Sequence, residues 1–344
     1  MPTCEFYTDA GRDAWQRYIT ASGDCGIYHD IGWKHAIERA YGHKTPYLIA
    51  RTNGNVTGVL PLVLTRSRLF GSALTSLPFL DFAGISADDA ASAEALLVSA
   101  AELGERHAVD YVEFRQREPL EPDLETSTHK VLMTLSLAPD EDSVWSNLSS
   151  ERRNRVRRAL KSGLSVEEAD GSRLNEFYDI WVRNMRDLGS PPHSKNFFQQ
   201  VLDAFSGRSS LLMVCHDGRY IGAALALFSH DTMVVPWVSS LRQHFKLYPN
   251  NILYWEAMRI AVGKGIKTFD FGRSTEGSGT YQFKQRWGAV PTTLYWQRLP
   301  IRQGAAVEAP STDGKYQRAV EIWKKIPVPV TRWIGPALRK NITA

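Results

Sequence analysis

Tyr47-Leu-Ile-Ala-Arg-Thr-Asn-Gly-Asn-Val-Thr-Gly-Val-Leu-Pro-Leu62 has a close counterpart later in the chain, Leu212-Met-Val-Cys-His-Asp-Gly-Arg-Tyr-Ile-Gly-Ala-Ala-Leu-Ala-Leu227. Each stretch reads as an apolar strand, a polar turn and a second apolar strand. The turns, Asn53-Gly54 and Asp217-Gly218, are dipeptides that two-residue hairpins favour, because both central residues need positive φ. The turn glycines, and the glycines four residues after each of them, share one offset of 164 residues. The sequence therefore predicts one antiparallel hairpin, present twice.

A second repeated block follows each hairpin. Residues Ala95–Arg106 are helix-like and run into an apolar strand, Val109–Arg115, and the same arrangement recurs in Ile252–Gly263 and Ile266–Gly272. The two strands are offset by 157 residues. Two blocks in the same order at similar offsets indicate two copies of one α/β unit. We expect each copy to contain a mixed sheet with flanking helices.

The chain has 344 residues, of which 43% are hydrophobic and 23% charged, so it can bury a sizeable core and has room for about two domains. We place the domain boundary close to Pro139. This gives a first domain over 1–138, a second domain over 139–300 that carries the site, and a C-terminal tail over 301–344 that matches neither copy.

Composition excludes several classes of protein. Mean hydropathy is -0.30, and no run approaches the ~20 apolar residues needed to span a bilayer. The first residues have neither a basic nor an apolar leader segment, so we expect a cytoplasmic protein. Three scattered cysteines favour neither a disulfide framework nor a zinc site, and we expect no metal and no resident cofactor. The net charge of +4 is compatible with an anionic substrate.

The second copy departs from the first after its last strand, where it continues as Asp270-Phe-Gly-Arg-Ser-Thr-Glu-Gly-Ser-Gly-Thr-Tyr-Gln-Phe-Lys-Gln-Arg-Trp-Gly288. Glycines such as Gly272 let the backbone approach a ligand closely. Thr280 is predicted to cap a short helix. The first copy runs instead into a loop with two prolines, so we expect the site in the second copy.

The predicted helix carries Tyr281, Phe283 and Lys284. Phe283 shares a face with Trp287, four residues on, and this apolar face should pack, which leaves Lys284 to point elsewhere. Lys284 is either an ordinary surface lysine or an ammonium that stabilises the oxyanion of an acyl-transfer intermediate. Tyr281 either donates a hydrogen bond or packs through its ring.

These residues carry a family resemblance. Phe269-Asp-Phe-Gly-Arg-Ser274 followed by Gly279-Thr-Tyr-Gln-Phe-Lys-Gln-Arg-Trp-Gly288 resembles the C-terminal signature of FemAB-like proteins, in the branch associated with exosortase/PEP-CTERM systems. Leu77-Pro-Phe-Leu-Asp-Phe-Ala-Gly84 and Leu188-Gly-Ser-Pro-Pro-His-Ser194 are similar to that branch as well. The resemblance covers most of Tyr28 to Trp296. It implies two tandem GNAT-like domains that transfer an acyl or aminoacyl group to an amine of a cell-envelope or exopolysaccharide precursor.

The resemblance also implies roles for individual residues. Phe283-Lys284 matches a pair at the family's reaction centre, so we expect catalytic roles for Lys284, Phe283 and Tyr281. A family lysine that contacts substrate phosphate has its nearest match in Trp33-Lys34. The residues that we expect to bind substrate are Trp33, Lys34, Asp81, Arg152, His193, Gly272, Arg273 and Ser274.

Some of these residues have plainer alternatives. Arg273 can bind a phosphate or carboxylate, or form a salt bridge at the end of a strand. His193 follows two prolines that stiffen a loop, and it is either a general base or a structural histidine. The basic run Ser150–Lys161 is either a solvated helix face or a phosphate-binding rim, and Arg152 falls within the apolar stripe of that helix.

The donor is expected to be aminoacyl-tRNA rather than acyl-CoA. GNAT enzymes bind the coenzyme A pyrophosphate through a glycine-containing loop at a helix N-terminus, whereas the matching stretch Val238–Ile252 has no glycine and contains Pro249. The expected partners are therefore an anionic small-molecule or lipid-linked acceptor, and tRNA. A coenzyme A-dependent N-acyltransferase and a non-catalytic RNA-binding or scaffold protein of the polysaccharide machinery stay as alternatives.

The tail interleaves Trp323 and Trp333 with aliphatic and basic residues. Two readings are open for it. It packs on its own domain, or it rests on an anionic membrane surface, which would place the protein peripherally at the inner membrane.

Overall fold

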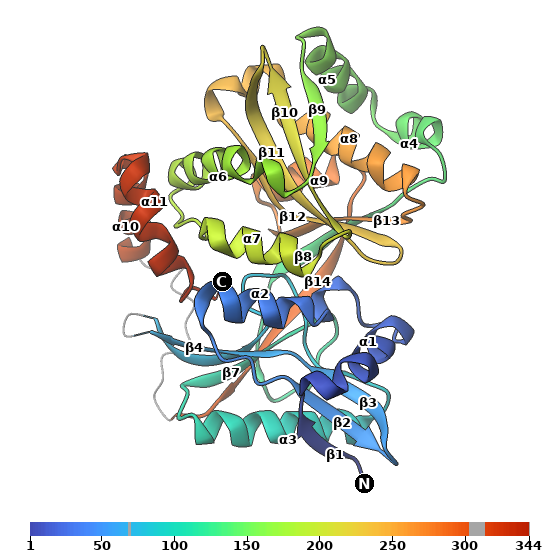
Figure 1. Cartoon of the computed structure of the whole chain (residues 1–344), viewed down its shortest axis with the longest axis vertical. Coiled ribbons are helices and arrows are strands. Elements are labelled where there is room, and N and C mark those ends of the chain that lie inside the picture. The colour runs from blue at the N-terminus through green and yellow to red at the C-terminus, as the bar shows by residue number, and fades with distance from the viewer. Residues whose placement is uncertain (68–69, 303–313, 344) are drawn as a thin grey trace. The chain divides into compact units, whose positions relative to one another are not determined.

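The computed structural model describes residues 1–67, 70–302 and 314–343, which form two compact units (Figure 1). Unit 1 comprises Met1–Lys130 with the described parts of Thr293–Ala309 and Lys340–Ala344. Unit 2 comprises Val131–Thr292 with the described part of Pro310–Arg339. Two of the passages of the chain between the units lie within strands, β8 (Glu125–Ser136) and β14 (Val290–Pro300), and another lies between Arg339 and Lys340.

Among its described residues, unit 1 contains two groups of hydrogen-bonded strands and three α-helices. The strand order is β1-β2-β3-β6 in one group and β4-β5-β7-β14 in the other. The elements are β1 (Thr3–Phe6), α1 (Arg12–Ala21), α2 (Gly32–Tyr41), β2 (Leu48–Thr52), β3 (Asn55–Leu60), β4 (Leu62–Ser67), β5 (Gly71–Ser76), β6 (Ser86–Ala87), α3 (Ala90–Arg106) and β7 (Tyr111–Gln116).

Unit 2 is built on a sheet in which β13, β12, β11, β10 and β9 follow one another. Its elements are α4 (Glu141–Asn147), α5 (Ser150–Lys161), β9 (Ser165–Ala169), α6 (Leu174–Leu188), α7 (Lys195–Ala204), β10 (Ser209–His216), β11 (Arg219–Phe228), β12 (Thr232–Ser240), α8 (Pro249–Gly263), β13 (Thr268–Thr275), α9 (Gly279–Gln285), α10 (Gly314–Lys325) and α11 (Val328–Arg339). A short 3-10 helix, η4 (Arg242–Leu247), joins β12 to α8.

Helices cover both faces of the sheet of unit 2. Alternate residues of a strand point to opposite faces, and in β11 Ala224 and Ala226 join the core cluster beneath α8. Leu225 and Leu227 between them are equally buried but lie outside that cluster, on the face where α6 packs. The strand is therefore apolar at successive positions because both of its faces are covered.

The predicted duplication is confirmed by the backbone. Both hairpin turns have positive φ, at Asn53-Gly54 (51° and 83°) and at Asp217-Gly218 (48° and 70°). In each unit the strand after the helix also pairs in parallel over three positions. Ala73–Thr75 pairs with Tyr111–Glu113 in unit 1, and Thr232–Val234 pairs with Thr268–Asp270 in unit 2. The expected mixed sheets with flanking helices are present in both copies.

The two compact units divide the chain differently from the expected linear boundaries. Residues Tyr295–Pro300 of β14 pair with Tyr111–Gln116 of β7, so they belong to unit 1 and not to the second domain. Helices α10 and α11 belong to unit 2, because they pack on α6. Both departures depend on contacts between segments that lie far apart in the sequence, β14 with β7 and the last two helices with α6. The repeat pattern does not encode such contacts.

Candidate functional site

The candidate site lies where the parallel strands β12 and β13 stop pairing. Their register joins Thr232 to Thr268, Met233 to Phe269 and Val234 to Asp270. Beyond these pairs β12 continues to Ser240 and β13 to Thr275, and no further pairing joins the two strands in the described chain. The backbone N–H and C=O groups on these facing edges need other hydrogen-bond partners, which a ligand or a side chain can provide.

A local turn of the β13 backbone starts this unpaired segment. Gly272 has φ of 73°, a left-handed conformation that favours glycine. Its N–H donates to the buried Asp270 carboxylate at 2.7 Å. Gly272 thus adopts a backbone conformation that glycine permits, and Asp270 holds that conformation, while close approach of a ligand stays a prediction.

Lys284 donates hydrogen bonds to two carbonyl groups at this turn. Its Nζ donates to the carbonyl oxygen of Gly272 at 2.9 Å and to that of Arg273 at 2.8 Å, and the side chain is only 8% exposed. The side chain is therefore not that of an ordinary surface lysine, and its catalytic role stays a prediction. The ammonium lies instead against β13, because a buried cation needs acceptors and two strand carbonyls are free of a β12 partner.

The short helix α9 sets the position of Lys284. Ser278 caps it, with its hydroxyl oxygen accepting from the N–H of Tyr281 at 3.2 Å, so the predicted cap at Thr280 is off by two residues. The predicted apolar face is confirmed. Phe283 packs on Tyr254 and Trp287, with ring centroids 5.5 and 6.4 Å away, and Tyr281 is half-buried against the same core.

Arg152 comes into contact with this helix from α5. Its guanidinium is fully buried and lies 5.9 Å from the ring centroid of Phe283. It donates to Asn251 at 3.1 Å and to Glu151 at 3.0 Å, while its Nε has no hydrogen-bond partner among the described residues. Asn251 belongs to the first turn of α8, which follows β12. From α5, Arg152 therefore contacts both α8 and α9. The sequence carries no signal for the role of Asn251.

Two further β13 residues border the unpaired segment. The Ser274 hydroxyl is buried and has no hydrogen-bond partner in the described part of the chain. Arg273 is half-buried, and its carbonyl binds Lys284. The structure therefore brings together Gly272, Arg273, Ser274 and Lys284, with Phe283 and Arg152 beside them, and the roles of these residues stay a prediction.

The first-copy candidates all lie within unit 1. Lys34 donates to the Glu38 carboxylate at 2.6 Å and to the Thr45 hydroxyl at 2.7 Å. Trp33 is buried and donates to the Ile27 carbonyl at 2.8 Å, while Asp81 accepts from the Tyr28 hydroxyl at 3.4 Å. Each side chain thus has a partner inside its own unit, and substrate binding by them stays a prediction.

His193 lies inside an aromatic cluster of α7 and β12. Its ring stacks on Phe197 with centroids 4.4 Å apart, it is 1% exposed, and its Nε2 accepts from Arg339 at 3.2 Å. Burial, with the Arg339 charge as a second cause, lowers the pKa of His193 well below its ordinary value. These contacts favour a structural histidine, neutral and buried in the core, over a general base.

This environment predicts a pH-dependent stability. Because the folded pKa of His193 is depressed, protons bind the unfolded chain first as pH falls below about 6.5, and the free energy of unfolding should fall by about 1 kcal/mol per pH unit. Buried His29, whose pKa burial lowers to about 4, should add a similar slope in unit 1. Urea unfolding at pH 7.5 and 5.5 checks this. His193→Gln, which keeps an acceptor for Arg339, should reduce the loss, and an identical loss in this variant would contradict the assignment.

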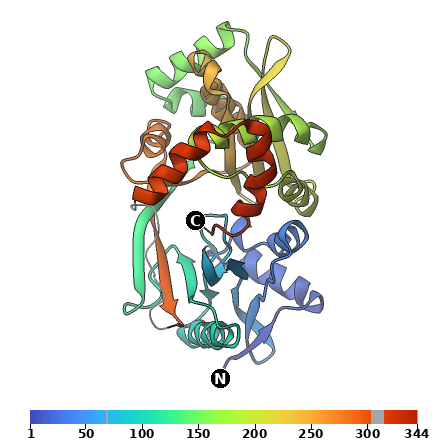
Figure 2. The same ribbon diagram turned by 90° about the vertical axis from the view of Figure 1, so that its left-hand side faces the viewer.

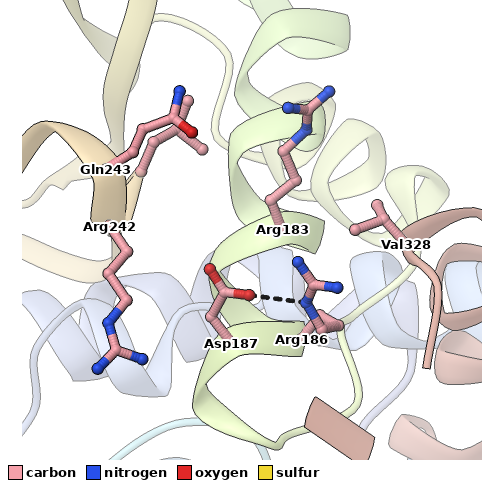
Figure 3. A pocket seen from close by; sticks show the side chains of 7 residues that line it. Arg183, Arg186, Asp187, Arg242, Gln243 and Val328 are labelled. Carbon is pink, nitrogen blue, oxygen red and sulfur yellow. Dashed lines mark hydrogen bonds and ion pairs between the residues drawn. The ribbon is translucent and has the colours of Figure 1, made fainter. Parts of the chain in front are cut away.

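A pocket of about 510 Å³ lies in unit 2 next to the end of β12 (Figure 3). Helix α6 contributes Arg183, Arg186 and Asp187 to its lining. The 3-10 helix η4 contributes Arg242 and Gln243, and α11 contributes Val328. Sequence reasoning missed this pocket. The sequence signal for it is weak, a basic stretch after β12 that forms no recognisable motif.

The described part of the tail packs on α6, which is one of the two expected readings (Figures 1 and 2). Trp323 and Thr331 are buried, and Gly335 lies so close to Pro192 that an added Cβ would be 2.4 Å from the proline Cδ. Trp333 is 82% exposed on the outer face, and membrane contact stays a prediction. Among the described helices, none is long and apolar enough to cross a bilayer. Residues 303–313 of the predicted tail lie outside the described residues.

Comparisons with known proteins agree on the fold. The profile of a family described as an acetyltransferase (GNAT) domain matches residues 150–285, which contain the candidate site. A lipid II:glycine glycyltransferase of Staphylococcus haemolyticus is 27% identical over 97 residues, or 26% of this chain, and the match spans only 23% of that protein.

Solved structures resemble most of the chain at low sequence identity. The crystal structure of FemX superposes with a TM-score of 0.66 at 16% identity, covering 85% of this chain and 96% of that one. A tandem GNAT protein from the clavulanic acid biosynthesis pathway gives 0.59 at 10% identity, covering 88% of this chain and 100% of that one. The two copies are therefore tandem GNAT-like domains.

Proposed function

We propose that this tandem GNAT-fold protein is an amide-forming transferase that moves an acyl or aminoacyl group onto an amine of a cell-envelope or exopolysaccharide precursor. The observation that carries the proposal is the unpaired segment of β12 and β13 in unit 2, with Lys284 and Arg152 beside it. The similarity to FemX and to a glycyltransferase supports this activity over other reactions of the fold. Membership of the exosortase/PEP-CTERM branch is part of the proposal.

The reaction needs few groups from the protein. A neutral amine attacks the donor carbonyl, an oxyanion forms on the carbonyl oxygen, and the ester oxygen of the donor leaves with the proton that the amine loses. Lys284 supplies a positive charge next to the unpaired strand edges, where a preorganised donor stabilises the oxyanion. Asp270 keeps the Gly272 turn in place, so the carbonyls that hold the ammonium stay fixed.

Aminoacyl-tRNA is the favoured donor class. The start of α8, where a coenzyme A pyrophosphate would bind, is occupied by contacts of the protein itself. Pro249 provides no N–H, the Asn250 side chain accepts from Ser240 at 2.6 Å, and the Asn251 side chain accepts from Arg152. An acyl-CoA donor is the alternative, and the match to an acetyltransferase (GNAT) family is the observation in its favour.

The outer face of α5 provides the test of donor class. Arg157 and Lys161 are exposed on it, whereas Arg153 is not suited to RNA binding because it donates to the carbonyls of Ser146 and Leu148. RNA affinity should fall with salt with a log–log slope of about 0.7–0.9 per phosphate contact. Arg157→Ala with Lys161→Ala should therefore flatten the slope by about 1.5.

Filter binding of charged tRNA at several salt concentrations measures this slope. Arg219→Ala with Lys267→Ala removes the same charge elsewhere on unit 2 and should leave the slope unchanged. Saturable acetyl-CoA binding that is insensitive to salt, with no tRNA binding, would support the acyl-CoA alternative instead.

A further inference from the structure

The outer faces of α10 and α11 carry exposed apolar side chains in rows. On α11, Val330, Trp333 and Ala337 follow one another at helical spacing, and all three are exposed, Trp333 by 82% and Val330 by 43%. On α10, Ile322 is 64% exposed. Single exposed apolar side chains are ordinary on a soluble protein, whereas a row of them that includes a tryptophan indicates an interaction surface.

The opposite faces of the two helices account for their packing in unit 2. Both helices pack on α6, where Trp323 and Thr331 are buried and Gly335 lies against Pro192. Figure 2, in which α10 and α11 are red, shows both of them in the foreground. Because the outer side chains stay exposed in the described chain, their apolar character is not explained by the packing of the fold.

Positive charge surrounds these rows. Residues 314–339 contain six basic residues and one acidic residue, Glu321, which forms an ion pair within α10 at 2.7 Å. Arg318 and Lys325 are exposed on the same side of α10 as Ile322, four residues before it and three after it. Cations bind anionic headgroups, and tryptophan favours the region between headgroups and acyl chains. The pattern therefore complements an anionic lipid surface.

We propose that the outer faces of α10 and α11 dock on an anionic lipid bilayer, with Trp333 as the interfacial anchor. A bilayer fits this surface better than a protein partner does, because lysine is depleted in protein–protein interfaces, whereas basic residues beside tryptophan are typical of helices that lie on membranes. This docking goes beyond the proposed transfer reaction and does not rest on it.

Co-flotation of the full chain with vesicles tests the docking without any transfer assay. We expect the chain to bind vesicles of equal parts phosphatidylglycerol and phosphatidylcholine, and to bind vesicles of phosphatidylcholine alone about tenfold more weakly. Raised salt should release it, because salt screens exposed charges.

Trp333→Ala should lower the partition coefficient about tenfold, because the variant removes the largest apolar side chain of the row. The side chain is 82% exposed, so the fold should survive, and thermal unfolding checks this. Phe6→Ala, which removes a 48% exposed aromatic ring from β1 of unit 1, is the matched control and should change binding less than twofold.

The contribution of charge is tested separately. Arg318→Ala with Lys325→Ala should lower binding to the anionic vesicles by more than about tenfold, since each cation near such a surface contributes about fivefold. Arg219→Ala with Lys267→Ala removes the same charge from exposed positions elsewhere on unit 2 and should change binding less than twofold.

Bromine-labelled phospholipids report whether Trp333 itself enters the bilayer. They should quench part of the wild-type fluorescence, and Trp333→Phe, which keeps an aromatic ring and much of the binding, should lose that part. Unchanged quenching in this variant, no binding to anionic vesicles, or equal partition of the wild-type and Trp333→Ala proteins would overturn the proposal. Self-association that requires Trp333, without vesicle binding, would also overturn it and assign the face to a second copy of this chain.

Discussion

Lys284→Met should lower the rate of acyl transfer by about 100-fold or more, mainly through kcat. Removing one donor that stabilises an oxyanion costs about that much, because the donor acts in the transition state and little in substrate binding. Methionine keeps most of the aliphatic length of lysine, so the buried side chain should still fill its space. The variant also leaves the Gly272 and Arg273 carbonyls without their donor, which should cost about 1–3 kcal/mol of stability.

Stability and activity therefore have to be measured together. Thermal unfolding establishes the temperature range in which Lys284→Met is folded, and kinetics are compared only there. Lys264→Met is the matched control, because Lys264 is an exposed lysine outside the candidate site, with a partly exposed ion pair to Glu168 at 3.3 Å and its ammonium 5.1 Å from the Phe228 ring centroid. An unchanged kcat in a well-folded Lys284→Met protein would show that Lys284 merely fastens α9 to β13.

Glu113→Ala is the substitution with the largest expected effect on stability, a loss of about 3–5 kcal/mol. Glu113 is 1% exposed on β7, and its carboxylate accepts from Arg115 at 2.9 Å and from Arg298 of β14 at 2.8 Å. Arg115 is fully buried, so removal of Glu113 leaves a guanidinium without its counter-ion inside unit 1. Urea unfolding measures the loss, and Glu118→Ala, which removes a surface carboxylate, should change stability little.

The pH dependence of the same group has a defined sign. Burial alone raises the pKa of Glu113, but Arg115 and Arg298 outweigh it and hold the pKa below its ordinary value. The ion pairs therefore stabilise the fold above the ordinary carboxyl pKa, and this contribution is lost as pH falls through the lower folded value. A wild-type protein equal in stability to Glu113→Ala at neutral pH would contradict the role of the buried pairs.

Local chemistry makes much of this fold predictable. Asn53-Gly54 and Asp217-Gly218 permit few turn types, and their common offset is enough to indicate the duplication. The Gly272 conformation and the Phe283 face are predictable for the same reason, because each depends on residues within a few positions. Periodicity alone places Arg152 within the apolar stripe of its helix, and it is buried.

Long-range contacts are not predictable in this way. Lys284 is held by carbonyls of β13, and those carbonyls are free only because β12 and β13 stop pairing. The prolines before His193 indicate a stiff loop, whereas Arg339, distant in sequence, meets this histidine within the fold. Arg183 and Arg242 share a pocket across two elements, and no spacing in the sequence indicates it.

The most direct test of the central claim is a radiolabel transfer assay with two donors. The full chain is incubated with labelled aminoacyl-tRNA or labelled acetyl-CoA and an extract of amine-bearing envelope and polysaccharide precursors, and amide-bound label is counted. We predict transfer that requires charged tRNA, is abolished by ribonuclease, and falls about 100-fold in Lys284→Met. Equal transfer by wild-type and Lys284→Met proteins, or no transfer from either donor, would contradict the assignment of unit 2 as the site of acyl transfer.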